Sequence, residues 1–175
     1  MNTLAMLGTS RADGNTRRAL DAVLGDRMVH VIDLAMLAIT PFDYAHENSD
    51  DAFLSLAERL VRADLLILAT PVYWYSMSAQ MKAFLDRWSD LVTVRKDLGR
   101  ALAGRRLCVV VSSRSRDLPD GFSVPFELTA RYFELQWEGC CHVQFLGDGV
   151  PSPEALGVAR SFGDRVLGRR TREEE

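Results

Sequence analysis

Apolar residues follow two alternating patterns along the chain. Short runs that are almost entirely apolar predict strands at 3–8, 28–34, 64–69, 106–111 and 139–146. Between these runs, apolar residues recur every three or four positions, which predicts helices at 15–24, 51–62, 77–91, 122–136 and 153–167. Ser152 directly precedes the last helix, where a serine side chain can cap the first N–H groups.

The strands at 3–8, 64–69 and 106–111 are apolar at nearly every position. Such strands are typical of a parallel sheet that helices cover on both faces. Five strand–helix units in series therefore predict an α/β fold with a doubly wound five-stranded parallel sheet, in the flavodoxin-like order 2-1-3-4-5. We expect residues 1–168 to form one domain, with a charged C-terminal tail at 169–175.

Composition narrows the range of partners. The formal net charge is −3, which argues against nucleic acid as a main partner because phosphate backbones are bound largely by Lys and Arg. No apolar run reaches the roughly 20 residues that span a bilayer. The first strand begins shortly after Met1 and leaves no room for a signal peptide, so we expect a cytoplasmic protein. Cys108, Cys140 and Cys141 form no C-x-x-C motif and are expected to be small buried residues.

The loop after the first strand carries candidate phosphate ligands. In doubly wound sheets, ligands bind outside the carboxyl ends of the strands, where the strand order reverses. This loop offers the hydroxyls of Thr9, Ser10 and Thr16, the guanidinium of Arg11 and the amide of Asn15, at the start of a helix with unpaired N–H groups. The alternative is a polar turn in which Asn15 caps the helix. The loop matches neither G-x-x-x-x-G-K nor G-x-G-x-x-G, which disfavours a P-loop triphosphatase and a Rossmann dehydrogenase.

The loop after the third strand is aromatic. It contains Tyr73, Trp74 and Tyr75 in succession, after Pro71, which keeps the backbone extended. A flavin ring needs apolar walls and backbone polar groups along its pyrimidine edge, and this loop can supply both. The alternative is that the aromatic residues pack on a neighbouring helix or a partner subunit.

Further along the chain, the candidates are less specific. Ser112 and Ser113 begin a polar loop after the fourth strand that would lie beside the same edge, although a merely solvated loop has the same composition. The i, i+4 pair Lys82 and Asp86, together with Arg87, is interpreted as structural. Of the three histidines, His30 and His142 fall in predicted strands and are expected to be structural, whereas His46 lies in a loop that could approach the site. We assign no catalytic acid or base.

Two segments resemble motifs of the NAD(P)H-dependent FMN reductase family, in its branch related to iron–sulfur flavoproteins. The sequence G-T-S-R-A-D-G-N-T at 8–16 is similar to the phosphate loop G-S-x-R-x-x-G-N-T, and residues 70–87 are similar to T-P-x-Y-x-x-x-x-S-x-x-x-K-x-F-x-D-R. The resemblance implies bound FMN, reduction by NAD(P)H, and a homodimer or homotetramer. It assigns the FMN phosphate to Ser10, Arg11, Asn15 and Thr16, and the isoalloxazine and ribityl groups to Pro71, Val72, Tyr73, Trp74, Tyr75 and Ser76.

The chain also departs from the pattern of the family that it resembles. It has no cysteine at 39–44, where the iron–sulfur members carry a cysteine cluster, so we expect no iron–sulfur cluster and no other metal site. Ser112, Ser113 and Arg114 stand where many relatives have glycines after the fourth strand. The sequence therefore does not assign the contacts that the loop after the fourth strand would make with a cofactor.

The expected activity is that of a flavin oxidoreductase. NAD(P)H would reduce FMN, and reduced FMN would pass electrons to a quinone, a free flavin or another small acceptor, with the chemistry supplied by the cofactor. One alternative is a flavodoxin-type electron-transfer protein without NAD(P)H activity of its own, although flavodoxins are usually more acidic. Another is an interaction module that has lost its flavin.

A stripe of large apolar residues after the aromatic loop bears on assembly. Met77, Met81, Phe84 and Trp88 recur at four-residue spacing and share a helix face. Together with the aromatic loop, they favour self-association beside the flavin. The alternative is that this stripe packs on the sheet of its own subunit.

Overall fold

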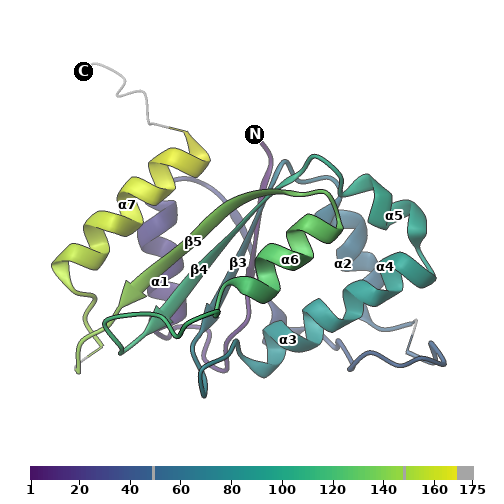
Figure 1. Ribbon diagram of the computed structural model, residues 1–175, viewed down its shortest axis with the longest axis horizontal. Helices are drawn as coiled ribbons and strands as arrows, with labels where there is room; N and C mark the ends of the chain where they lie inside the picture. The colour runs from purple at the N-terminus through teal and green to yellow at the C-terminus, as the bar shows by residue number, and fades with distance from the viewer. Residues whose placement is uncertain (49, 148, 169–175) are drawn as a thin grey trace.

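Five parallel strands alternate with helices along the chain (Figure 1). The computed structural model describes residues 1–48, 50–147 and 149–168, so the expected tail at 169–175 lies outside the described residues. The sheet order β2-β1-β3-β4-β5 confirms the predicted α/β, doubly wound topology. The strands are β1 (Thr3–Leu7), β2 (His30–Asp33), β3 (Leu65–Pro71), β4 (Arg106–Ser113) and β5 (Gln136–Gln144). The helices are α1 (Asn15–Leu24), α2 (Ala52–Leu60), α3 (Ala79–Asp86), α4 (Asp90–Thr93), α5 (Lys96–Ala101), α6 (Val124–Tyr132) and α7 (Pro153–Leu167), with 3₁₀ turns at Leu34–Met36 and Arg87–Ser89.

The sheet separates two hydrophobic cores. Alternate residues of β3 point to opposite faces: Leu66 and Leu68 pack with α2, α3 and α6, whereas Leu65 and Ile67 pack with α1 and α7. Both faces are buried, which explains why the central strands are apolar at almost every position. On the second face α1 and α7 pack so closely that a Cβ at Gly163 would lie 2.0 Å from the Val23 carbonyl oxygen.

The prediction of a single helix at 77–91 is wrong. The Ser78 side chain accepts a hydrogen bond from the Met81 N–H group, so the helix begins at Ala79. The helix tightens into a 3₁₀ turn at Arg87–Ser89 and continues as α4. This change of pitch accompanies the burial of Arg87 and its ion pair with Asp90.

The boundaries around β5 also differ from the prediction. The helix before β5 ends at Tyr132 rather than at residue 136. Two residues after this end, Glu134 adopts a φ of 55°. The strand begins at Gln136 rather than 139, and its register with β4 shifts between Leu107 and Val109. Gly139, with a φ of 96°, lies in this irregular stretch, which made the start of the strand resemble a loop in the sequence.

The carboxyl ends of all five strands meet at one edge of the sheet, as parallel pairing requires. The loops that follow β1, β3 and β4 therefore gather at that edge (Figure 1). The strand order reverses between β1 and β3, which is where ligands bind in doubly wound sheets.

Candidate functional site

A polar hollow of about 230 Å³ lies where the three loops meet. It is lined by the predicted residues Arg11, Asn15, Thr16, Pro71, Val72, Tyr73, Ser112 and Ser113, together with Thr9, Gly14 and Arg114, which were not selected from the sequence as site residues. Of the described residues that line it, none is acidic. The hollow therefore presents hydroxyl, amide and guanidinium donors, which is the donor set that a phosphate group requires.

The start of α1 forms one wall of this polar hollow. Asn15 is the first residue of the helix rather than its cap, so the alternative assignment of Asn15 as a capping residue is wrong. Gly14 occupies the cap position, and no side chain of the described residues caps the helix. The first N–H groups of α1 are therefore left for a ligand, and the helix dipole favours a negative one. The Thr16 and Ser112 hydroxyls, both buried, lie 2.8 Å apart and join α1 to β4.

Buried polar groups join the loop after β1 to the loop after β3. The Ser78 hydroxyl donates to the Gly8 carbonyl at 2.6 Å, and the Ser78 N–H group donates to the Thr70 hydroxyl at 3.0 Å. Neither side chain lines the polar hollow. The Thr and Ser of the long motif at 70–87 therefore position the loop rather than contact a ligand.

The aromatic loop ends in a tight turn. The Tyr73 N–H group donates to the Ser76 carbonyl, the Ser76 N–H group donates to the Tyr73 carbonyl, and Trp74 and Tyr75 have φ values of 48° and 66°. This is a type I′ turn, whose two central positions favour glycine, asparagine and aspartate. The turn leaves Trp74 92% and Tyr75 75% exposed.

A second hollow, of about 350 Å³, lies between this turn and the third loop. Its lining residues are Val72, Trp74, Tyr75, Ser115, Asp117, Leu118 and Pro119. We call it the aromatic hollow. Val72 lines both hollows, so the polar and the aromatic hollow adjoin.

Two predicted contacts lie outside both hollows. The Ser10 hydroxyl accepts a hydrogen bond from the Gln80 side chain of α3 at 3.3 Å. Ser76 closes the type I′ turn through its backbone. Neither serine lines the polar or the aromatic hollow.

The third loop holds a contact that sequence reasoning missed. Ser112 and Ser113 point to opposite faces of β4, because successive strand residues alternate. Ser113 lines the polar hollow, and its Oγ lies 2.8 Å from Nε2 of His142 on β5. Burial lowers the pKa of His142, and the Asp117 carboxylate opposes that shift. The sequence prediction ended the fourth strand at residue 111 and placed Ser113 in a loop, whereas the contact depends on β4 continuing to Ser113.

His46 does not approach the site. Its Nδ1 atom lies 3.1 Å from a carboxylate oxygen of Asp90 on α4. Asp90 in turn pairs with the buried Arg87. His46 thus belongs to a buried ionic cluster that anchors the loop after β2 and lines neither hollow.

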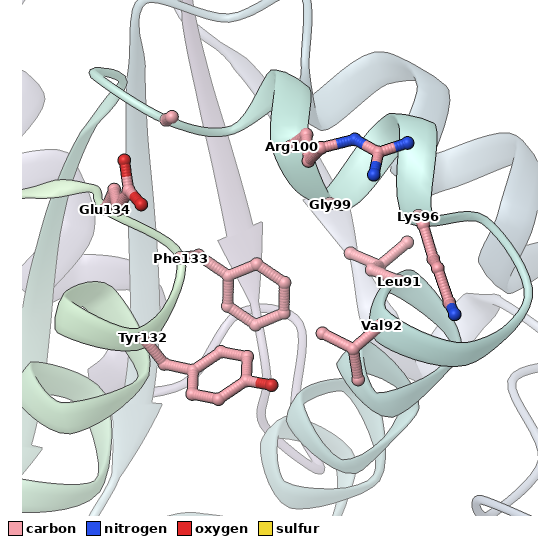
Figure 2. A pocket seen from close by; sticks show the side chains of 9 residues that line it. Leu91, Val92, Lys96, Gly99, Arg100, Tyr132, Phe133 and Glu134 are labelled. Carbon is pink, nitrogen blue, oxygen red and sulfur yellow. The ribbon is translucent and has the colours of Figure 1, made fainter.

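A larger hollow, of about 560 Å³, lies away from this edge. Figure 2 shows Lys96 and Arg100 on one side of it and Tyr132 and Glu134 on the other. Residues 99–103 precede β4 and residues 132–134 precede β5, so this hollow lies near the amino ends of those strands. Ligands of doubly wound sheets bind at the opposite ends, which leaves the polar and aromatic hollows as the candidate site.

Comparison with known proteins identifies the family. The model of the NADPH-dependent FMN reductase family matches residues 1–118, which include the first and second loops and β4. A Bacillus subtilis (strain 168) protein named as an NAD(P)H-dependent FMN-containing oxidoreductase, YwqN, is 36% identical over 97 residues. That match covers 51% of this chain and 53% of the relative, so the chain aligns with about half the length of this curated protein.

Solved structures share the whole fold. The Trp repressor binding protein of Bacillus subtilis matches with a TM-score of 0.74 at 23% identity, over 92% of this chain and 96% of that one. An FMN-dependent NADH-azoreductase of Bacillus anthracis, solved in complex with FMN, matches with a TM-score of 0.64 at 11% identity, over 94% and 97% of the two chains. At these identities, the structural matches establish the flavodoxin-like fold alone.

Proposed function

The chain belongs to the NADPH-dependent FMN reductase family, and we propose from that premise that it binds FMN across the polar and aromatic hollows. The observation that carries the proposal is that these two hollows adjoin at Val72, at the carboxyl edge of the sheet. One offers donors for a phosphate, and the other offers aromatic and apolar walls. In this proposal NAD(P)H reduces the cofactor, and a quinone, a free flavin or another small acceptor then takes the electrons.

The polar hollow fits the phosphate end of FMN. The uncapped start of α1 supplies backbone N–H groups, and Arg11 and Thr16 add a guanidinium and a hydroxyl. No acidic side chain of the described residues lines this hollow, which favours a phosphate dianion there. Ser10 was expected to join this set, but its hydroxyl faces Gln80, so we place it at the margin of the phosphate site.

The aromatic hollow fits the ring end. Bound FMN supplies the hydride chemistry, and the protein supplies binding, orientation and polarity. Val72 lines both hollows, and Trp74, Tyr75, Leu118 and Pro119 line the aromatic one. The N–H groups of Val72, Tyr73 and Ser76 are bonded within the protein, so those of Trp74 and Tyr75 are the ones in this loop that can serve the polar edge of the ring. Ser76 contributes through its backbone in the turn.

Flavin fluorescence tests the proposal. Titration of the protein into FMN should quench the fluorescence with one-to-one stoichiometry, and NADPH added without oxygen should then bleach the visible flavin absorption. A protein that takes up no FMN at micromolar concentration contradicts the proposal. A protein that binds FMN but is not reduced by either NADPH or NADH is instead a flavodoxin-type carrier.

The partners follow from the same proposal. We expect small molecules as electron donors and acceptors and no nucleic acid partner. Within residues 1–48, 50–147 and 149–168, no helix combines the length and the apolar character of a membrane span. The cytoplasmic location and the homodimer or homotetramer expected from the sequence stay predictions.

A further inference from the structure

We propose that His142, acting through the Ser113 hydroxyl, supplies the proton that accompanies reduction of the acceptor. The inference rests on the proposed function, because it requires a reducible flavin in the polar and aromatic hollows. His142 does not itself line either hollow, whereas Ser113 lines the polar one. The pair would therefore join the outside of the site to its interior.

The strand register brings the two side chains together. In the parallel pairing of β4 with β5, Val111 lies opposite His142 and Ser113 lies opposite Gln144. Residues two apart share a face, so Ser113 and His142 are diagonal neighbours on the face that carries α6. Their side chains meet at 2.8 Å between Oγ and Nε2.

The protonation state of His142 sets the direction of this hydrogen bond. In the imidazolium form both ring nitrogens carry a hydrogen, so Nε2 donates to Ser113 Oγ. The Ser113 hydroxyl has a single hydrogen, which in this arrangement it donates to the Ser115 carbonyl at 3.2 Å. The imidazolium form therefore directs a proton at the residue that lines the polar hollow.

The surroundings of His142 favour its neutral form, and negative charge on a reduced flavin nearby would favour the imidazolium. The side chain is partly buried, which lowers its pKa, and the carboxylate of Asp117 in the third loop raises the pKa by a smaller amount. The other groups on this face carry no opposing charge: the Gln144 amide donates to the Arg114 carbonyl, and burial raises the pKa of the Cys140 thiol to about 12. Arg114, the residue that follows Ser113, lines the polar hollow.

The balance of the reaction requires such a proton. For a quinone acceptor, the overall change is quinone + NAD(P)H + H⁺ → hydroquinone + NAD(P)⁺. NAD(P)H supplies two electrons and one proton as a hydride, and one further proton must enter the site. The Ser113 hydroxyl would turn from the Ser115 carbonyl toward the hollow and release its proton there, while protonated His142 passes its Nε2 proton to Ser113 Oγ. Solvent would then reprotonate His142. Only the imidazolium form can do this, so acceptor reduction should slow as pH rises above the pKa of His142.

The first measurement is a proton NMR titration of the histidines, with His142→Gln to assign the signal of His142. Asp117→Asn should lower the pKa of His142 in the cofactor-free protein. Reduction of bound FMN by dithionite should raise it, because added negative charge favours the imidazolium. If the signal does not respond to reduction of the flavin, the inference is wrong.

The second measurement is the pH profile of quinone reduction. The rate in the parent protein should fall about tenfold per pH unit above the pKa of His142. His142→Gln can keep the hydrogen bond to Ser113 but cannot titrate, so this limb should disappear while FMN affinity is retained. Asp117→Asn should move the limb to lower pH. His30→Gln, on the strand at the far edge of the sheet, is the matched control and should keep the parent profile.

Fluorescence titration separates the two levels of the argument. A chain that binds no FMN overturns the proposed function, and this inference with it. A chain that binds and is reduced by NADPH, but whose pH profile is the same in His142→Gln and in the parent, overturns the inference alone.

Discussion

Arg87 joins segments that are far apart in the sequence. Its guanidinium is fully buried and binds the carboxylates of Asp51 and Asp90. It also donates to the backbone carbonyls of Thr40 and Asn48, at 3.2 Å and 3.3 Å. The sequence placed Arg87 at the end of a family motif and predicted a structural role. The role is confirmed. Apart from Asp90, however, the partners could not be read from the sequence, because they come from the segment between β2 and α2.

We predict that Arg87→Ala destabilises the protein by about 3–5 kcal/mol, because it leaves two buried carboxylates without their counter-ion. Urea unfolding followed by circular dichroism would measure the change. The matched control is Arg95→Ala, which removes partly exposed ion pairs to Asp97 and Glu58 and should cost at most about 1 kcal/mol. Equal losses in the two variants would show that the buried cluster contributes no more than a surface pair.

Arg11 tests the phosphate site at the same scale. Its side chain is 75% exposed and lies 3.8 Å from the Asp13 carboxylate, so the protein holds this guanidinium less rigidly than it would hold a buried phosphate ligand. We expect Arg11→Ala to weaken FMN binding by about 1.5 kcal/mol, the lower end of the range for a hydrogen bond to a charged group. That is roughly a tenfold rise in Kd.

Riboflavin, which lacks the phosphate, is the control ligand for Arg11. Its affinity should change little in Arg11→Ala, because the lost contact is to the phosphate alone. Fluorescence titration of both ligands gives the two ratios. A similar loss for riboflavin and FMN would place Arg11 at the ring or the ribityl chain instead.

Among the elements, the turn at 73–76 departs furthest from local preference. Its central positions carry Trp74 and Tyr75 at positive φ, where bulky residues are rare outliers. Each such residue costs roughly 1–3 kcal/mol of backbone strain. Strain of this kind is often found at functional sites, and this turn forms a wall of the aromatic hollow.

We predict that the double change Trp74→Asn and Tyr75→Gly stabilises the cofactor-free protein by about 1–2 kcal/mol, because Asn-Gly suits a type I′ turn. The same change should weaken FMN binding, since each lost aromatic contact is worth about 0.5–1.5 kcal/mol. Thermal unfolding without FMN and fluorescence titration with FMN would measure the two effects. A variant that is less stable than the parent would show that the aromatic side chains contribute more than the turn costs.

The elements themselves were largely predictable from periodicity. The five strands and their order follow from apolar runs and from the rules for parallel crossovers. The errors fall where local pattern and tertiary contacts disagree. The pattern continued the helix through Arg87, where a buried ion pair tightens the turn, and it began β5 at Gly139 rather than at Gln136. Glu138 is a polar strand residue held by Arg106 and Arg165, a pairing that periodicity does not reveal.

At the scale of the whole molecule, the structure changes the argument for self-association. Met77, Met81, Phe84 and Trp88 are buried in the core, so the proposed interface stripe packs on its own sheet. Trp88, for example, contacts the ring of Phe133 with centroids 5.2 Å apart. A charge at Trp88 would therefore disrupt the core rather than test assembly. The exposed part of the original argument is the turn at Trp74 and Tyr75, beside the site.

We retain the prediction of a dimer or tetramer and move its test to Tyr75, which is exposed. Large exposed aromatic side chains beside a binding site often mark an interface. Sedimentation equilibrium at low micromolar protein should show an assembly that Tyr75→Glu weakens, with NADPH oxidation falling in parallel. Val158→Glu, at an exposed apolar position on α7, is the matched control and should keep both assembly and activity. A parent protein that sediments as a monomer would contradict self-association.

If Leu128→Glu on α6 dissociates the assembly while Tyr75→Glu does not, the interface lies along α6, and the aromatic turn serves the flavin site alone.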